Sequence, residues 1–164
     1  MKFIDVLEAK SIYRKGENIT EYLRTKFGSE ENTSDIIEIA YDLQAGSYIE
    51  QVKSNRAQVE NYAAELSGIL KQHLEPGDSL LDVGTGEITN FTFVLNDLDI
   101  KLSDIVALDI SWSRLSVGLK FHEESRKTDF SLKAFVADIK EIPLHEKCVD
   151  VVTSSHALEP NGKN

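Results

Sequence analysis

An acid and two closely spaced glycines follow a short apolar run and form the first candidate site. Asp82 is followed, after Val83, by Gly84-Thr85-Gly86. Glycine has no Cβ, so a strand can turn sharply here and its backbone can approach a ligand closely. Ligands of open parallel sheets bind beyond the carboxyl ends of the strands. Asp82, Gly84, Thr85 and Gly86 are therefore predicted to line a ligand site.

Two further acids end apolar runs downstream. Asp109, followed by Ile110, closes the run Ile105-Val106-Ala107-Leu108, and Asp138, followed by Ile139, closes the next run. A carboxylate beyond the second strand can accept both ribose hydroxyl protons of an adenosine, as in many nucleotide-binding folds. We expect this role for Asp109, and we expect Asp138 to accept from the adenine amino group. The alternative is that each acid merely caps a turn or the following helix.

The charge of the glycine turn argues against a pyrophosphate ligand. A pyrophosphate needs a helix N-terminus free of competing anions, whereas Asp82 and Glu87 flank this turn. Thr89 also stands where the dinucleotide fingerprint has its third glycine. An NAD(P)-dependent oxidoreductase is therefore the less favoured alternative. A phosphate-free cofactor that carries positive charge, such as S-adenosylmethionine, suits an acidic turn better.

The elements that must position these residues alternate between strands and helices. Strands are expected over residues 79–83, 104–109, 132–137 and 149–154, and helices over 88–95 and 112–122, with Ser111 as N-cap. Strands separated by helical segments imply crossovers and a parallel sheet. The predicted fold class is α/β, a Rossmann-like parallel sheet of four strands behind an N-terminal helical segment.

The chain before Pro76 has helical patterns. A helix is expected over residues 35–43, capped by Thr33 or Ser34, and a long one over 47–74, because Val52, Val59 and Leu66 recur every seventh residue. Proline and glycine chemistry at 75–78 stops it. The predicted domains are a helical segment, 1–75, and a Rossmann-like core, 76–164.

Four ordered segments of the core resemble motifs of the class I S-adenosylmethionine-dependent methyltransferases, in the branch that acts on small molecules. They lie within residues 80–86, 106–111, 134–144 and 149–159. The resemblance spans about residues 78–160. Ile88 departs from it, because the family usually has another glycine there. The family's sheet also continues beyond a fourth strand. This departure predicts either an incomplete core or a fourth strand whose edge is covered by the N-terminal helices, a partner or a second copy.

The resemblance implies roles for single residues. Asp82, Gly84 and Gly86 would line the methionine end of the cofactor, Asp109 would hold the ribose, and Asp138 with Ile139 would contact the adenine. Ser154 and His156 would face the methyl group or the substrate, and His156 is the candidate general base, although it could equally pack on its neighbours.

The function implied is methyl transfer to an unidentified small-molecule acceptor, with S-adenosylhomocysteine as product. A non-catalytic module that binds S-adenosylmethionine or S-adenosylhomocysteine is the alternative.

Composition and residue spacing argue against several other classes. The formal net charge of -10 argues against a nucleic-acid partner, which requires clustered Lys and Arg. The histidines have no ligand spacing, so no metal site is expected. Neither a signal peptide nor a membrane-spanning run is evident, and the single Cys148, expected to be buried, favours a reducing compartment. These features together predict a cytoplasmic location.

Overall fold

The computed structural model describes residues 6–155 and 157 and contains a four-stranded parallel sheet. The spatial order of the strands is β3-β2-β1-β4. Apolar side chains dominate both faces of the two central strands, as expected for strands that are covered on both sides. The bounds are β1 Ser79–Val83, β2 Asp104–Asp109, β3 Leu132–Val136 and β4 Val151–Thr153.

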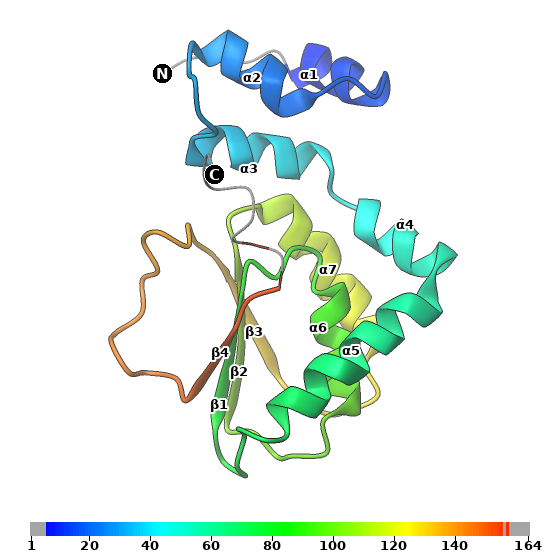
Figure 1. Cartoon of the computed structure of the whole chain (residues 1–164), viewed down its shortest axis with the longest axis vertical. Coiled ribbons are helices and arrows are strands. Elements are labelled where there is room, and N and C mark those ends of the chain that lie inside the picture. Colours follow the sequence, from blue (N-terminus) through cyan, green and yellow to red (C-terminus); the bar gives the residue numbers. More distant parts are fainter. Residues whose placement is uncertain (1–5, 156, 158–164) are drawn as a thin grey trace.

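Three helices cover one face of the sheet (Figure 1). The crossovers from β1 to β2 and from β2 to β3 run in the same direction, so both place their helices on this face. Leu80 of β1 and Ile105 of β2 are fully buried beneath them. The helices are α5 (Arg56–Leu70), α6 (Thr89–Asp97) and α7 (Trp112–Ser125), the last capped by Ser111 as predicted.

The connection between β3 and β4, residues 137–150, crosses the opposite face (Figure 1). This crossover runs back toward the other edge of the sheet, and it contains no helix. Leu81 and Val83 of β1 and Leu108 of β2 are buried on this face. The apolar side chains of the connection that pack against them are Ile139, Ile142 and Val149.

The N-terminal helices form a small core of their own above the carboxyl ends of the strands (Figure 1). Leu23, Ile36 and Ala40 are completely buried in it. Thr33 caps the third helix, as predicted, by accepting the backbone N–H of Ile36. The bounds are α1 Val6–Arg14, α2 Ile19–Phe27 and α3 Ser34–Leu43.

The single helix predicted over residues 47–74 is wrong. The segment contains α4 (Ser47–Ser54) and α5, separated at Asn55, whose φ of -141° and ψ of 48° are not helical. Val52 of α4 still packs in the same core as Leu70 of α5. The seven-residue apolar repeat therefore continues from α4 into α5, so it gave no sign that the helix is interrupted at Asn55.

Two smaller expectations near the fourth strand also differ. Cys148 is exposed, not buried. β4 begins at Val151, because the carboxylate of Asp150 accepts the backbone N–H of Ser79 at 2.8 Å in place of a strand pairing. Within residues 6–155, no strand pairs with the outer edge of β4. No helix in the described part of the chain is long and apolar enough to cross a bilayer.

Candidate functional site

The glycine turn has the backbone geometry that its sequence requires. Gly84 and Gly86 have φ angles of 70° and 59°, in the left-handed region that favours glycine. The N–H groups of Gly84 and Thr85 donate to the carbonyl oxygen of Leu108 at 2.8 and 3.0 Å. These bonds hold the turn against the end of β2, so β1 and β2 contribute to one site.

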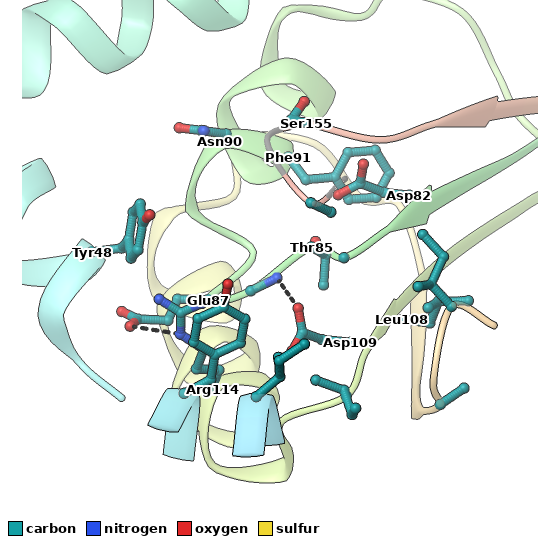
Figure 2. Close-up of a pocket in the computed structure, with 18 of the residues that line it drawn as sticks. Tyr48, Asp82, Thr85, Glu87, Asn90, Phe91, Leu108, Asp109, Arg114 and Ser155 are labelled. Atoms are coloured by element: carbon teal, nitrogen blue, oxygen red, sulfur yellow. Dashed lines mark hydrogen bonds and ion pairs between the residues drawn. The ribbon is translucent and has the colours of Figure 1, made fainter. Parts of the chain in front are cut away.

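Asp109 joins the same turn through its side chain. Its Oδ2 accepts the N–H of Gly86 at 2.8 Å, the bond drawn at Asp109 in Figure 2. Its Oδ1 accepts the N–H of Ser111 at 2.9 Å. Burial raises the pKa of the Asp109 carboxyl, while these two N–H groups and the charge of Arg114 oppose the rise. Each carboxylate oxygen keeps a second lone pair, which can accept a ligand hydroxyl.

Asp82 is the most perturbed acid of the site. Burial raises its pKa to about 6, against the opposing effect of the Thr85 and Thr153 hydroxyls. Thr153 of β4 donates its hydroxyl to Asp82 Oδ1 at 2.8 Å. In an almost fully buried carboxyl whose pKa stays raised despite nearby hydroxyls, the ionised form is stabilised by a cation placed beside it.

Glu87 binds the N-terminal segment. Its Oε1 accepts the N–H of Gly46 and its Oε2 that of Ile49, both at 2.9 Å. These are N–H groups of the first turn of α4, which has no side-chain cap of its own. The side chain that sequence reasoning placed as a neighbour of the ligand therefore caps a helix.

Two more carboxylates attach α3 to the strand ends. Asp138 accepts the hydroxyl of Ser34 and, at 2.9 Å, the N–H of Lys140, and these bonds lower the pKa of Asp138. Asp42, near the other end of α3, accepts the Ser111 hydroxyl at 2.5 Å. Helix α3 thus lies across the ends of β2 and β3 and forms one wall of the site.

One cavity of about 190 Å³ lies between these elements. Asp82, Asp109 and Asp138, at the ends of three adjacent strands, all line it. Of the other residues predicted from the sequence, the lining includes Gly84, Thr85, Gly86, Ile110 and Ile139.

The C-terminal end of the predicted site is placed differently. Ser154 is exposed and does not line the cavity, whereas Ser155 does and accepts the Tyr62 hydroxyl at 3.1 Å. His156 lies outside the described residues. In an extended segment adjacent side chains point to opposite sides, so a shift of one residue moves the side chain out of the cavity.

Sequence reasoning missed the residues that the helices contribute. From α3, its C-cap residue and α4 come Ser34, Ile37, Tyr41, Gln44 and Tyr48, and from α7 comes Arg114. Only Arg114 had a local signal. It follows Asp109 in the first turn of the next helix, and in this fold that turn lies at the strand ends.

Arg114 is a buried cation of this acidic cavity, which Lys140 also lines. Its guanidinium lies over the rings of Tyr41 and Tyr48, with the carbon Cζ 4.4 and 4.9 Å from the ring centroids, and its Nε lies 3.9 Å from Glu87 Oε1 (Figure 2). The residue is 6% exposed. Among the described residues, no acceptor is within hydrogen-bond reach of the Nε–H.

Comparison with known families gives a match for the second half of the chain. Residues 81–160 match the methyltransferase domain family. Comparison with curated protein sequences gives no match.

Solved structures share this fold. A protein from Methanococcus maripaludis assigned as an S-adenosylmethionine-dependent methyltransferase is 19% identical, with a TM-score of 0.59 over 72% of this chain and 51% of its own. A protein from Haloferax volcanii assigned as a methyltransferase, solved with the Trm112 methyltransferase activator, is 22% identical, with a TM-score of 0.51 over 70% and 46%. The [4+2]-cyclase SpnF is 18% identical, with a TM-score of 0.52 over 74% and 48%. The chain thus spans about half the length of these structures.

Proposed function

Because residues 81–160 match the methyltransferase domain family and the described part of the chain forms a Rossmann-like parallel sheet, we propose that this chain binds S-adenosylmethionine at its strand ends. The methyl group is transferred there to a small-molecule acceptor, and S-adenosylhomocysteine is the product. The fold alone does not determine the reaction, since it is shared with a cyclase. The proposal therefore depends on the chemistry of the site.

The observation that carries the proposal is the arrangement of three acids around one cavity. Asp82, Asp109 and Asp138 end adjacent strands, and the glycine turn lies beside the first two. This spacing suits a ligand with a cationic group at one end and a ribose and base at the other. Asp82 would face the ammonium group, Asp109 the ribose hydroxyls, and Asp138 with the N–H of Ile139 the adenine.

The electrostatics favour the same ligand over a phosphate. The carboxylates of Asp82, Glu87 and Asp109 all lie beside the glycine turn and are almost completely buried. An added phosphate would be repelled by them, whereas ammonium and sulfonium charges would be stabilised. Bound here, the cofactor supplies a methyl group on a positively charged sulfur, open to in-line attack by the acceptor.

The chain contributes alignment and exclusion of water to such a reaction. The aromatic rings of Tyr41, Tyr48 and Phe91 line the cavity together with the acids, so its polar groups lie next to apolar walls. Holding the reacting groups in line lowers the entropic part of the barrier. His156 remains our candidate for accepting the acceptor's proton. Ser155, the residue that precedes His156 in the sequence, lines the cavity.

Calorimetric titration tests the proposal. The wild-type chain is expected to bind S-adenosylhomocysteine and S-adenosylmethionine but not NAD, and Asp109→Ala is expected to lose most of this affinity. Asp129→Ala, at an exposed acid in the loop after α7, is the matched control and should bind normally. Binding of NAD alone would overturn the proposal. Binding of S-adenosylmethionine without methylation of any acceptor in a panel would instead support a non-catalytic, cofactor-binding module.

A further inference from the structure

Arg114 is a buried cation whose hydrogen-bonding capacity is largely unused. A guanidinium presents five N–H donors, and burial of such a group is normally accompanied by acceptors for them. Here the rings of Tyr41 and Tyr48 lie close to the group, with their centroids 4.4 and 4.9 Å from Cζ, and they supply cation–π attraction. The Nε–H has no partner among the described residues.

Glu87 does not supply the missing partner. Its two carboxylate oxygens already accept the N–H groups of Gly46 and Ile49. The distance of 3.9 Å from Arg114 Nε to Glu87 Oε1 exceeds a hydrogen bond, so the two groups form only a loose ion pair. The edge of the guanidinium is therefore left for something else.

The position of the guanidinium indicates what kind of group would bind its free edge. A Cβ added to Gly86 would lie 3.8 Å from Arg114 Nη1, so the charged group is next to the glycine turn and lines the cavity. We propose that Arg114, held by its contacts with the rings of Tyr41 and Tyr48, binds a ligand carboxylate there. This inference rests on the proposed function, since it concerns the same cavity.

The charges on either side of the turn favour this assignment. The amino-acid end of S-adenosylmethionine is a zwitterion, and Asp82 with Arg114 provides an anion and a cation for its two charges. The fork of an arginine pairs with a carboxylate through two parallel hydrogen bonds. The second source of a carboxylate is the methyl acceptor, which would also enter this cavity.

Binding of two ligands to the full chain tests the assignment and separates the sources. S-adenosylhomocysteine carries the carboxylate, and 5′-methylthioadenosine keeps the adenosine and thioether but lacks the amino-acid end. Arg114→Gln is expected to weaken binding of the first roughly 10- to 100-fold and to leave the second unchanged. Arg114→Lys should recover part of the loss. Arg56→Gln, which removes a guanidinium that lies over the Phe93 ring, is the matched control and should change neither.

The other outcomes have distinct meanings. If Arg114→Gln leaves S-adenosylhomocysteine binding intact but abolishes binding of benzoate to the chain saturated with it, the carboxylate is the acceptor's and the assignment of Arg114 holds. Equal loss of both adenosine ligands, or loss of neither ligand together with no benzoate binding, would overturn it. If the wild-type chain binds no adenosine ligand, the proposed function itself fails and this assignment with it.

Discussion

Glu87 in the glycine turn accepts the backbone N–H of Gly46, at 2.9 Å, and so caps a helix 41 positions earlier in the chain. The N-terminal segment is thereby attached to the most constrained loop of the core. Asp42 and Asp138 add further bonds of the same kind at the two ends of α3. The wall that the helices add to the cavity is held by these three carboxylates, of which Glu87 and Asp138 also line the cavity.

Replacing Glu87 is expected to loosen this attachment. Glu87→Ala removes the acceptor of two buried N–H groups, and loss of such a cap should lower the free energy of unfolding by roughly 2 kcal/mol. Urea denaturation measures this. Glu50→Ala, which removes an exposed acid of α4 paired with Lys53, is the control and should change stability by less than about 0.5 kcal/mol. Equal stability of the two variants would contradict the role of the cap.

Asp82 is expected to destabilise the unliganded chain at neutral pH. Its folded pKa of about 6 lies above the usual 3.8, so the folded state binds the proton more tightly, and the free energy of unfolding falls as pH rises from about 4 to about 6. Asn cannot ionise, so Asp82→Asn avoids this loss of free energy of unfolding, and its amide oxygen can still accept the Thr153 hydroxyl. The variant should be more stable than wild type by up to roughly 3 kcal/mol at pH 7.5, with the gain shrinking toward pH 4. A variant less stable than wild type at pH 7.5 would refute this.

The same shift predicts how ligand affinity depends on pH. A bound ammonium group favours the ionised form of Asp82, so binding below pH 6 must release its proton. The affinity for S-adenosylhomocysteine is expected to rise up to about tenfold per pH unit between pH 5 and 6 and to level off above pH 7. Titrations in matched buffers measure this. The rise should be absent with 5′-methylthioadenosine, and persistence of the full rise in Asp82→Asn would assign it to another group.

Gly118 of α7 supports the glycine turn from behind. A Cβ added there would lie 2.6 Å from the backbone carbonyl carbon and oxygen of Glu87, too close for any relaxed packing. Gly118→Ala should therefore lower the free energy of unfolding by roughly 1–3 kcal/mol and weaken S-adenosylhomocysteine binding. Gly68→Ala, where nothing lies within 4 Å of the added carbon, should instead stabilise α5 by roughly 0.5–1 kcal/mol. If both variants gain stability, the packing of α7 on the turn is not as tight as described.

The elements that sequence patterns predicted best are those defined by their own residues. Both central strands have the expected bounds, because Leu80, Leu81 and Val83 lead into the glycine turn and Ile105–Leu108 is an unbroken apolar run ended by an acid. The break at Asn55 was missed because a seven-residue apolar period survives when two successive helices face the same core. The start of α4 was also hard to predict, because it is capped by Glu87 from another part of the chain.

In the site, too, features set by neighbouring residues could be predicted, whereas those that depend on distant contacts could not. Asp82, Asp109 and Asp138 could be located because a strand end is a local feature and adjacent parallel strands end at one edge. Tyr41 and Tyr48 could not, since they read as ordinary members of amphipathic helices, and only the docking of α3 and α4 brings them over Arg114. The helix cap made by Glu87 was equally invisible, because it joins residues far apart in sequence.

The connection over residues 137–150 contributes both to the wall of the cavity and to the cover over the second face of the sheet. The cavity is lined by its first residues, Ala137, Asp138 and Ile139. The second face of the sheet is covered by two later residues, Ile142 and Val149. A substitution that improves one of these tasks shifts the backbone on which the other depends. Selection on ligand preference and selection on solubility therefore act on one and the same loop, and changes within it should be found in compensating pairs.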